Sequence, residues 1–483
     1  MRRTPALVAL VATAALTTAG LAATSGGAAG APAHPAAVAR GGPGSWTTIS
    51  QGGVGITYAA SMTRTPDGVL HVVYPMFPSG GGTTIAHTSL DSDGSIVRKN
   101  DVLADAWADM DLGPVVVDGA SGMHVVFGGQ HDIGSGFFDN NRMFMADAGS
   151  DTGATWTLPM QNVGISDQAY GSYGTSAVEL ADGTVVAAFP LNNDIFWHVG
   201  TGGGADGQFH SPNCCIYSTS MVRDGSNVWV AWYQNGSTNA TNGTFAMQIY
   251  PTVGTPLKAP GSSQTSLGSP ASLPTGRVAL ATRAGGGVYA AYCVGYPTCQ
   301  KVRIWKVGTS QTADVPSSKY ATSIALSAGP TGRLWAAWAD NLPKVRAVRT
   351  GLNGLSMGAV RTVGIPSGHN AIYNVAIEGS RGRGDVVVNV GNAFWHTQVL
   401  AGLTLHASPS SWRHGSRKKV VFTVTDAHSA VAGATVKVGS SHCSTTSHGT
   451  CSITFPTSFG KGKHTASASH TGYAKATTTL KVS

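Results

Sequence analysis

One short unit, a tight turn followed by an apolar strand, recurs through most of this chain. In the segment 181–190 (ADGTVVAAFP) an Asp-Gly turn precedes a run of small, β-branched and aromatic residues that is free of proline until its end. Asp-Gly supplies the positive φ angles of a hairpin turn, and such a run is typical of a buried strand. Related units lie at 67–74, 121–127, 224–232, 286–292, 331–338 and 383–390.

The number and spacing of these units predict an all-β propeller. Upstream of most turns lies a second weakly apolar run, such as 176–180 or 323–326, that can pair with the strand after the turn. Repeats of roughly 40 to 60 residues with four short strands each are typical of propeller blades. We therefore expect a seven-bladed propeller over residues 41–401, in which a short strand at 46–49 pairs with the last blade. Six blades are the alternative, if one unit is only a hairpin insertion.

The two ends of the chain depart from this repeat. Residues 1–40 begin with two arginines, continue with an apolar run at 6–16 and end in an Ala/Gly/Pro-rich stretch. This is the pattern of a secretory signal peptide and leader, so we expect a secreted protein. No other segment has the 18 or more apolar residues of a membrane span. Residues 402–483 read as alternating short strands separated by Gly, Ser and Thr, which is typical of a small immunoglobulin-like β-sandwich.

The formal net charge of +8 is concentrated in residues 402–483, here called the tail domain. This domain holds nine Lys or Arg and one Asp, whereas the repeat region is nearly neutral. Its densest basic cluster is Arg413, Arg417, Lys418 and Lys419, and seven of the 16 histidines lie in the same domain. We therefore expect the tail domain to contact an anionic polymer or a cell wall. We expect a monomer with no nucleic-acid partner.

Six cysteines agree with an oxidising compartment. Two pairs flank a short loop or hairpin, and this spacing predicts two disulfides. The two pairs are Cys293 with Cys299, and Cys443 with Cys451. The remaining Cys214 and Cys215 are adjacent, and they either bond each other in a strained vicinal disulfide or remain as two buried thiols.

A motif near the end of the second repeat resembles a known family. The segment 151–156 (DTGATW) is similar to the Asp-box, Ser/Thr-x-Asp-x-Gly-x-Thr-Trp, of the bacterial neuraminidase repeats in the sialidase-like propeller superfamily. It departs from the motif at Gly149, where Ser or Thr is usual. In this hairpin the Asp accepts turn amides, the Gly takes an open φ, and the Trp packs between outer strands. The resemblance implies a sialidase-like propeller, but the family uses this motif away from its active site.

The resemblance does not extend to the catalytic residues of a true sialidase. That family has an arginine triad, a nucleophilic Tyr paired with Glu, and an acid-base Asp, and its first arginine opens the first inner strand. Here the matching stretch, 56–60 (ITYAA), has no arginine. The chain also has only two glutamates, Glu179 and Glu378, which we place just before turns at the opposite rim. We therefore do not expect sialidase activity.

Candidate functional residues gather where the repeat brings loops to one rim. The innermost strand of each blade starts there, and the connection between the second and third strands returns to it. Tyrosine rings stack on sugars, and Asp, Asn, Gln and His bond sugar hydroxyls, so such a rim suits carbohydrate. The candidate catalytic residues are Asp109, His131, Asp132, Tyr173 and Tyr217. The candidate substrate-binding residues are Tyr58, Asp194, Gln234, Asn235, Tyr320, Asp340 and Tyr373.

These residues predict a glycan-active protein. The leading interpretation is a glycosidase, which needs two carboxylates, or a polysaccharide lyase, which needs a Tyr or His base and a cation. The alternative is a non-catalytic carbohydrate-binding or surface-binding propeller, in which the tyrosines can also be wedges between blades. Convergence of two aspartates within about 10 Å at the rim would favour the enzyme. We expect no cofactor and no metal, because no metal-ligand spacing or phosphate-binding loop stands out.

Overall fold

The computed structural model describes residues 42–483 with several gaps. The gaps are 52, 55–57, 78–81, 104–106, 108–112, 131, 135–136, 139–141, 149–151, 158–173, 202–205, 213–215, 237, 239, 263–277, 296–297 and 341, and only the backbone is described at 132–134, 137–138, 142 and 218. The predicted leader, residues 1–40, and the adjacent pair Cys214 and Cys215 therefore lie outside the described residues.

Seven antiparallel four-stranded sheets make up the larger part of the described chain, and each contains one of the repeated turn-strand units. The first sheet consists of β2 (Ser61–Arg64), β3 (Leu70–Met76), β4 (Thr84–Leu90) and β5 (Ile96–Asp101). The second consists of β6 (Val115–Gly119), β7 (Gly122–Gly129), β10 (Arg142–Ala148) and β11 (Trp156–Thr157). The third consists of β12 (Ser176–Glu179), β13 (Val185–Leu191), β14 (Asp194–Val199) and β15 (Gly207–His210).

The remaining four sheets of this part follow the same order. The fourth consists of β16 (Ile216–Asp224), β17 (Asn227–Gln234), β18 (Gly243–Tyr250) and β19 (Leu257–Lys258). The fifth consists of β20 (Ala279–Thr282), β21 (Val288–Val294), β22 (Lys301–Lys306) and β23 (Thr312–Asp314). The sixth consists of β24 (Ala321–Ala328), β25 (Leu334–Asp340), β26 (Lys344–Arg349) and β27 (Arg361–Gly364), with the 3-10 turn η3 (Pro330–Gly332). The seventh consists of β28 (Asn374–Glu378), β29 (Gly384–Val390), β30 (Ala393–Val399) and β1 (Thr47–Thr48).

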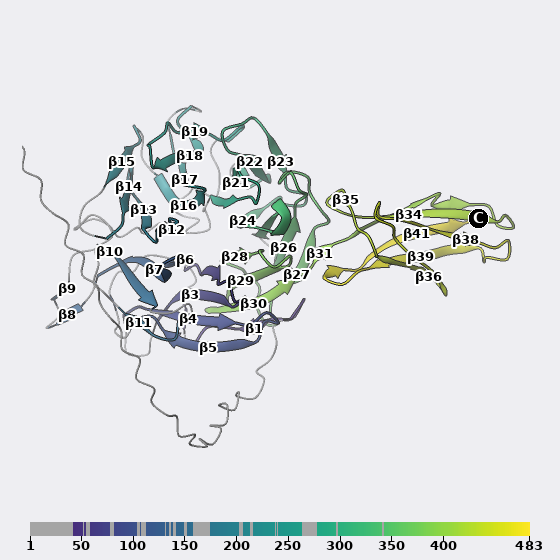
Figure 1. The fold of residues 1–483 in the computed structure, drawn as a ribbon, viewed down its shortest axis with the longest axis horizontal. Helices are drawn as coiled ribbons and strands as arrows, with labels where there is room; N and C mark the ends of the chain where they lie inside the picture. Colours follow the sequence, from purple (N-terminus) through teal and green to yellow (C-terminus); the bar gives the residue numbers. More distant parts are fainter. Residues whose placement is uncertain are drawn as a thin grey trace, which may run out of the picture. The chain divides into compact units, whose positions relative to one another are not determined.

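The first strands of the seven sheets, β2, β6, β12, β16, β20, β24 and β28, each contact the next in order, and β28 contacts β2 again. They enclose a central channel, and the remaining strands of each sheet follow outward (Figure 1). The N-terminal strand pairs with the last sheet, with Thr47 opposite His396, as the sequence predicts. A ring of antiparallel sheets around a channel is the arrangement of a β-propeller, so the predicted all-β propeller fold is confirmed.

Serine side chains tie neighbouring inner strands together around this channel. Inner strands do not form ladders with one another, so their amide groups need other acceptors. Ser61 Oγ accepts the amide of Val116 at 3.2 Å. The same bond recurs from Leu280 to Ser220 Oγ at 3.2 Å, and from Val375 to Ser323 Oγ at 3.1 Å. These bonds satisfy amides at the channel wall without any charged group.

Apolar clusters fill the seams between neighbouring sheets. Trp107 and Phe127, for example, pack edge to face between the first and second sheets, with ring centroids 5.2 Å apart. Seven such clusters account for the seven seams, and an eighth lies in the tail domain. Burial of these side chains, at roughly 25 cal/mol per Å², is the main force that closes the ring.

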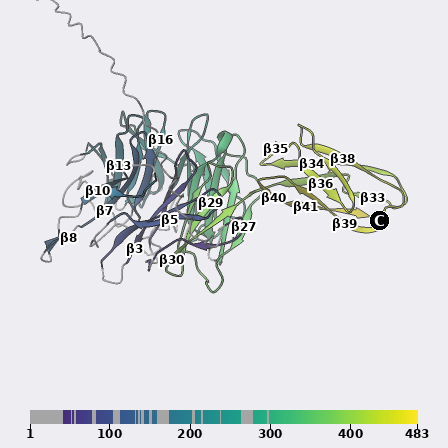
Figure 2. The same cartoon turned by 60° about the horizontal axis from the view of Figure 1, so that its bottom comes forward.

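The tail domain consists of two sheets around one apolar core that includes Val420, Phe422 and Leu480 (Figure 2). One sheet contains β32 (Thr404–Ser408), β34 (Lys418–Asp426), β35 (Ser429–Ala430) and β38 (Thr450–Phe455). The other contains β33 (Ser411–Trp412), β36 (Thr435–Val438), β37 (Ser441–Ser444), β39 (Gly462–Ser469) and β41 (Ala476–Val482). A short parallel pair, β31 (Ala401–Gly402) and β40 (Tyr473–Ala474), lies where the chain enters this domain.

Two of the predicted disulfides are present. Cys293 bonds Cys299 in the fifth sheet, and Cys443 bonds Cys451 in the tail domain, with Cα atoms 5.6 and 6.0 Å apart. A separate hairpin of β8 (Asp132–Gly134) and β9 (Phe137–Phe138) lies outside the larger sheets. No helix within the described part of the chain has the length and apolar character needed to cross a membrane.

Candidate functional site

The starts of the inner strands and the ends of the second strands share one rim of the propeller, here called the upper rim. Strand register shows this directly, because Ile216 pairs with Gln234, Ala321 with Asp340 and Asn374 with Asn389. The hairpin turns that join first and second strands lie at the opposite ends of the same strands and form the lower rim. The predicted site residues in the described sheets therefore do belong to the upper rim or its connections.

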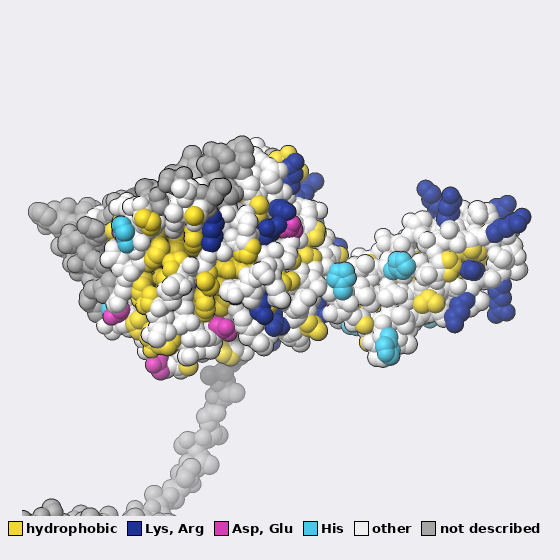
Figure 3. All heavy atoms as spheres, turned by 90° about the horizontal axis from the view of Figure 1, so that it is seen from above, with side chains coloured by type: hydrophobic (Ala, Val, Ile, Leu, Met, Phe, Trp, Pro, Cys, Tyr) yellow, Lys and Arg dark blue, Asp and Glu magenta, His cyan; other side chains and the backbone are white. Residues whose placement is uncertain are grey.

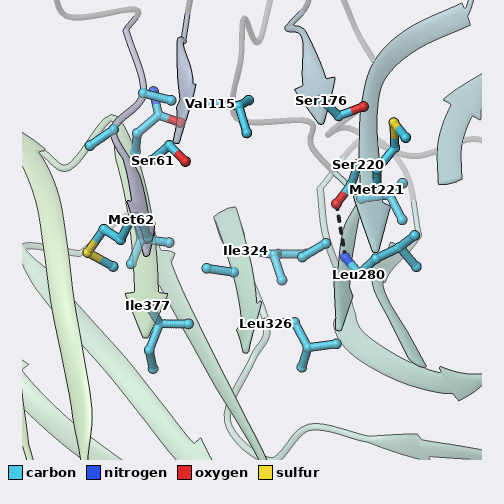
Figure 4. Close-up of a pocket in the computed structure, with 18 of the residues that line it drawn as sticks. Ser61, Met62, Val115, Ser176, Ser220, Met221, Leu280, Ile324, Leu326 and Ile377 are labelled. Carbon is cyan, nitrogen blue, oxygen red and sulfur yellow. Dashed lines mark hydrogen bonds between the residues drawn. The ribbon is translucent and has the colours of Figure 1, made fainter. Parts of the chain in front are cut away.

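The described wall of the central channel is neutral. It forms a cavity of about 200 Å³, lined by small and apolar side chains from all seven inner strands, among them Ser61, Met62, Ile324 and Ile377 (Figure 4). None of the described residues that line it is charged. The described part of the wall therefore supplies neither the paired carboxylates of a glycosidase nor the cation of a lyase.

Three predicted site residues meet in the fourth sheet. The Nδ2 group of Asn235 donates to the hydroxyl of Tyr217 at 3.2 Å, and Asn235 Oδ1 accepts the hydroxyl of Tyr233 at 3.0 Å. Gln234 accepts from Trp232 Nε1 at 2.9 Å and donates to the carbonyl of Thr241 at 2.7 Å. Tyr217 is only 7% exposed and stacks on Tyr233, so its ring is not open to a ligand at the rim. Close packing against the second strand covers its ring.

The two described candidate carboxylates are each engaged within their own sheet. Asp194 Oδ1, in the third sheet, accepts from Gln208 Nε2 and His210 Nδ1, both at 2.8 Å. Asp340, in the sixth sheet, is 4% exposed, pairs with Arg346 and accepts the amide of Leu342 at 2.9 Å. The structure does not bring these two aspartates together, because they belong to different, non-neighbouring sheets.

Tyr320 is the exposed tyrosine among the described candidates. Its residue is 41% exposed, and Lys319 Nζ lies 4.7 Å from its ring centroid. Its φ angle of +67° lies in the left-handed region, which a bulky side chain rarely occupies. The Tyr320 amide donates to the carbonyl of Cys299 at 2.7 Å, so the neighbouring disulfide loop supports this conformation.

Tyr58 and Tyr373 lie near each other at the seam between the first and seventh sheets. The carbonyl of Tyr58 accepts from Asn374 Nδ2 and Asn389 Nδ2, both at 3.0 Å. The amide of Tyr373 donates to the carbonyl of Asn389 at 3.0 Å. Both tyrosines are half-buried. The Tyr58 ring contacts Phe77, which is 41% exposed at the end of a second strand.

Phe77 is an upper-rim aromatic that the sequence analysis missed as a candidate. Its position directly after the apolar run of β3 was the available signal. Other predicted residues are not placed: Asp109, His131 and Tyr173 lie outside the described residues, and only the backbone of Asp132 is described, in β8. Within the described residues, no group of three or more His, Cys, Asp or Glu could hold a metal ion.

Most buried charge in the described propeller lies at the lower rim. Arg64 Nε and Nη2 contact Glu378 Oε2 and Asp385 Oδ2, each at 2.6 Å, across the seam between the first and seventh sheets. Burial alone would raise the pKa of Asp385, but the hydrogen bond and charge of His396 and the charge of Arg64 hold it below its usual range. Glu179 ends β12 and Glu378 ends β28, so both glutamates lie at this rim, as predicted.

A serine, a histidine and two carboxylates form a second lower-rim cluster. Ser121 Oγ lies 2.8 Å from His124 Nε2, and His124 Nδ1 lies 2.5 Å from Asp147 Oδ1. The Ser121 amide donates to Glu179 Oε1 at 2.8 Å. His124 also borders a cavity of about 270 Å³ next to Gly183. Ser121, His124 and Asp147 have the spacing of a hydrolytic triad, but Glu179 lies beside the serine.

A pair of buried histidines lies in the first sheet. His71 Nδ1 and His87 Nε2 are 2.9 Å apart, and His87 Nδ1 lies 2.8 Å from Asn100 Oδ1. Burial, and for His71 also the charge of His87, lowers the pKa of each histidine to about 4. Asn100 Nδ2 donates to the carbonyl of Gly153, in the predicted Asp-box hairpin, at 3.0 Å. These histidines therefore stabilise the contact between the first and second sheets and do not face the upper rim.

No family model and no curated protein matches the chain. A puromycin-hydrolyzing peptidase from Mycobacterium tuberculosis resembles it with 12% identity and a TM-score of 0.42, over 79% of this chain and 61% of the peptidase, which is less than two thirds of that protein. A fucose-specific lectin from Aleuria aurantia has 12% identity and a TM-score of 0.38, over 71% and 93% of the two chains. The intramolecular trans-sialidase from Ruminococcus gnavus has 9% identity and a TM-score of 0.37, over 72% and 98%. Likeness at these identities concerns the fold alone.

Proposed function

We propose that this chain is a secreted carbohydrate-binding protein whose binding surface is the upper rim of the propeller. The residues assigned to binding are Tyr320 and Phe77, supported by the half-buried Tyr58 and Tyr373. Among the two interpretations of the sequence, binding is favoured here over catalysis. The enzyme interpretation stays a prediction for Asp109, His131, Asp132 and Tyr173.

The observation that carries this proposal is the conformation of Tyr320. Its side chain is 41% exposed although its backbone occupies the left-handed region at φ +67°. A non-glycine residue in this region costs of order 1 kcal/mol or more, and such strain concentrates at functional sites. Tyr320 is exposed, so burial of its side chain does not offset this cost. An exposed aromatic ring beside the rim is what sugar stacking requires.

Catalysis is disfavoured by the state of the described carboxylates. Asp194 and Asp340 already accept two or more bonds each, and Asp340 is paired with Arg346. A paired-carboxylate mechanism needs two carboxyl groups that flank one bond, about 5 to 10 Å apart. These two aspartates belong to separate, non-neighbouring sheets, so they do not form an acid-base pair across one bond.

The proposal also gives each part of the chain a structural identity. The seven four-stranded sheets are taken as seven blades of the sialidase-like kind, with 151–156 as a degenerate Asp-box. The tail domain, 402–483, is taken as an immunoglobulin-like accessory domain because two sheets of four and five strands enclose one core. Residues 1–40 are taken as the leader that exports it.

The experiment is a glycan array probed with the full chain, run in parallel with a reducing-end assay on the glycans that bind. Tyr320→Ala and Phe77→Ala are compared with Leu352→Ala, which removes an exposed apolar side chain away from the upper rim. Each rim variant should weaken binding by roughly fivefold, which corresponds to about 1 kcal/mol of stacking. The control should bind as the parent does, and all three should keep its melting temperature.

Two results would contradict the proposal. If no glycan binds, or if Tyr320→Ala and Phe77→Ala bind like the control, the upper rim is not the binding surface. If the bound glycans are cleaved, the chain is an enzyme, and the undescribed candidates Asp109, His131 and Tyr173 become the first residues to replace.

A further inference from the structure

The strand order of the tail domain brings its basic residues to one end. β33, at Ser411–Trp412, pairs with the end of β41, and the loop 413–417 then leads into the start of β34. Lys418 at that start pairs with Phe455, and the loop 456–461 leads back to Gly462, which pairs with Val482. Both loops therefore lie at the same end. Seven of the nine basic residues gather there, and we call them the basic tip: Arg413, Arg417, Lys418, Lys419, Lys461, Lys463 and Lys481.

The charges of the basic tip are exposed and close to one another. All seven residues are exposed except Lys418, which is half-buried. Lys463 lies directly opposite Lys481 on the outer face of the five-stranded sheet, because the residues beside Lys481, Leu480 and Val482, point into the core. Like charges placed directly opposite on neighbouring strands destabilise a sheet. A neutral polar residue at either position would avoid this repulsion, yet both positions hold lysine.

No acidic side chain of the tail domain offsets this charge. Its single acid, Asp426, lies at the other end of β34, is 1% exposed and pairs with Arg349 and Arg333 of the sixth sheet. Figure 3 shows Lys and Arg gathered toward one end of the tail domain, with no acidic side chain on the face in view.

Several bases of the propeller, by comparison, are paired with an acidic side chain. In the fifth sheet, Lys301 and Arg303 both pair with Asp314, at 2.6 and 2.7 Å. In the sixth, Arg346 pairs with Asp340. Within the fully described residues 402–483, by contrast, no basic-tip residue has an ion-pair partner. Seven cations without an ion-pair partner thus lie together at one end of the tail domain, which is the footprint expected for a polyanion.

We propose that the basic tip binds an anionic polysaccharide, a chain of repeated carboxylates or sulfates. Five of its seven cations are lysines, which act as point charges on flexible stems, whereas nucleic-acid recognition favours arginine. Neither Trp412 nor Phe459, the aromatic residues near the basic tip, is placed to stack on nucleic-acid bases. Trp412 is 8% exposed, and Phe459 packs against Phe455 and His464. This site is separate from the upper rim, and its occupancy does not depend on the function proposed there.

The test compares two double variants of the full chain that remove the same charge. Lys463→Gln with Lys481→Gln neutralises the basic tip, and Lys437→Gln with Lys475→Gln neutralises the two exposed tail lysines that lie outside it. The probes are polygalacturonate, chondroitin sulfate, dextran and a single-stranded DNA of matched charge, at 0.05 and 0.3 M NaCl. A second tip pair, Arg413→Gln with Arg417→Gln, lies in a loop and guards against misfolding of the first.

The parent should bind one or both acidic polysaccharides at low salt, should not bind dextran, and should lose most binding at 0.3 M. Each tip pair should weaken binding about tenfold and should make the slope of log affinity against log salt less steep, because fewer counterions are released when fewer charges are neutralised. The control pair should stay within about twofold of the parent. Whether polygalacturonate or chondroitin sulfate binds more tightly decides between carboxylate and sulfate.

Three results would overturn the proposal. If neither acidic polysaccharide binds at 0.05 M, the basic tip is only a solvated surface. If the tip and control pairs weaken binding equally, net charge and not this site is responsible. If the DNA binds more tightly than both polysaccharides, the class of partner is wrong. Tyr320→Ala should leave this binding unchanged in every case, so failure here is distinguishable from failure at the upper rim.

Discussion

Ser121 Oγ lies 2.8 Å from His124 Nε2 at the lower rim, and the far side of the same imidazole contacts Asp147. A hydrolytic triad also needs amide donors for the oxyanion that forms at the serine. Here the Ser121 amide already donates to Glu179 Oε1, and Ser121 Oγ donates to the carbonyl of Gly183 at 3.1 Å. A carboxylate therefore occupies the place where negative charge would develop. Since Glu179 and Gly183 belong to the third sheet, the cluster fastens the second sheet to the third.

Replacing Ser121 with alanine should therefore affect stability and not function. Loss of its hydrogen bonds to His124 and Gly183 should lower the free energy of unfolding by about 1 to 2 kcal/mol. Chemical denaturation measures this loss, with Ser92→Ala, in an exposed turn, as the control. Hydrolysis of an activated ester by the parent that disappears in Ser121→Ala would instead identify a working triad.

The pair His71 and His87 predicts weaker folding in acid. Each histidine has a folded-state pKa of about 4, against an ordinary value near 6.5, so the unfolded chain binds more protons between these values. Stability contributed by the neutral pair is therefore complete above about pH 6.5 and is lost as the pH falls toward 4. At about 1.4 kcal/mol per pKa unit, one histidine accounts for a loss on the order of 3 kcal/mol.

Urea unfolding at pH 7.0, 5.5 and 4.5 measures this loss. His71→Gln should flatten the decline, because an amide can still donate to His87 Nε2 but does not titrate in this range. His406→Gln, at an exposed position of the tail domain, should leave the decline unchanged. An equally steep decline in His71→Gln would show that other groups dominate the acid sensitivity.

Local patterns were sufficient to predict the course of the chain but not the state of its side chains. Turn chemistry at Asp182-Gly183 and the apolar run that follows predict a hairpin because both depend on neighbouring residues. The pairing of Thr47 with His396 followed from the need to cover a sheet edge. Burial of Tyr217, in contrast, depends on its packing against Tyr233 and the next sheet, which no local pattern encodes.

The same limit explains why the sequence did not show whether the predicted aspartates are available to a ligand. A polar residue at a strand end indicates a place at the upper rim, and Asp340 does lie there. Whether its carboxylate is available depends on Arg346, which only strand register brings beside it. The lower-rim clusters were missed for the same reason, since Glu179 meets a residue 58 positions away in the chain.

Tyr217 should behave as a core residue. Tyr217→Ala removes a ring that is 7% exposed and should cost about 3 kcal/mol of unfolding free energy, as other buried aromatic truncations do. Tyr217→Phe keeps the ring and loses only the bond from Asn235 Nδ2, so it should cost about 1 kcal/mol. Thermal and urea unfolding of both variants measure the difference. Equal stability of Tyr217→Ala and the parent would restore Tyr217 as an open binding residue.

Asp426 should be the most sensitive acidic residue of the chain. Its buried carboxylate lies between Arg333 and Arg349, whose Nη1 also donates to the carbonyl of Gly382 at 2.8 Å. Asp426→Asn leaves two buried guanidinium groups without a counter-charge, and breaking a buried pair in this way costs about 3 to 5 kcal/mol. The control is Asp314→Asn, which breaks ion pairs of a carboxylate that is 43% exposed and should cost at most about 1 kcal/mol.

Because the lost pairs join β34 to the sixth sheet, the effect of Asp426→Asn should appear first where the tail domain meets the propeller. Limited proteolysis should cut this variant near residues 400–403 faster than the parent or Asp314→Asn. Calorimetry should show a low-temperature transition that the parent lacks, since the tail domain then unfolds without the support of Arg349. If Asp426→Asn and Asp314→Asn were equally stable and equally resistant to protease, the buried cluster would not hold the two parts together.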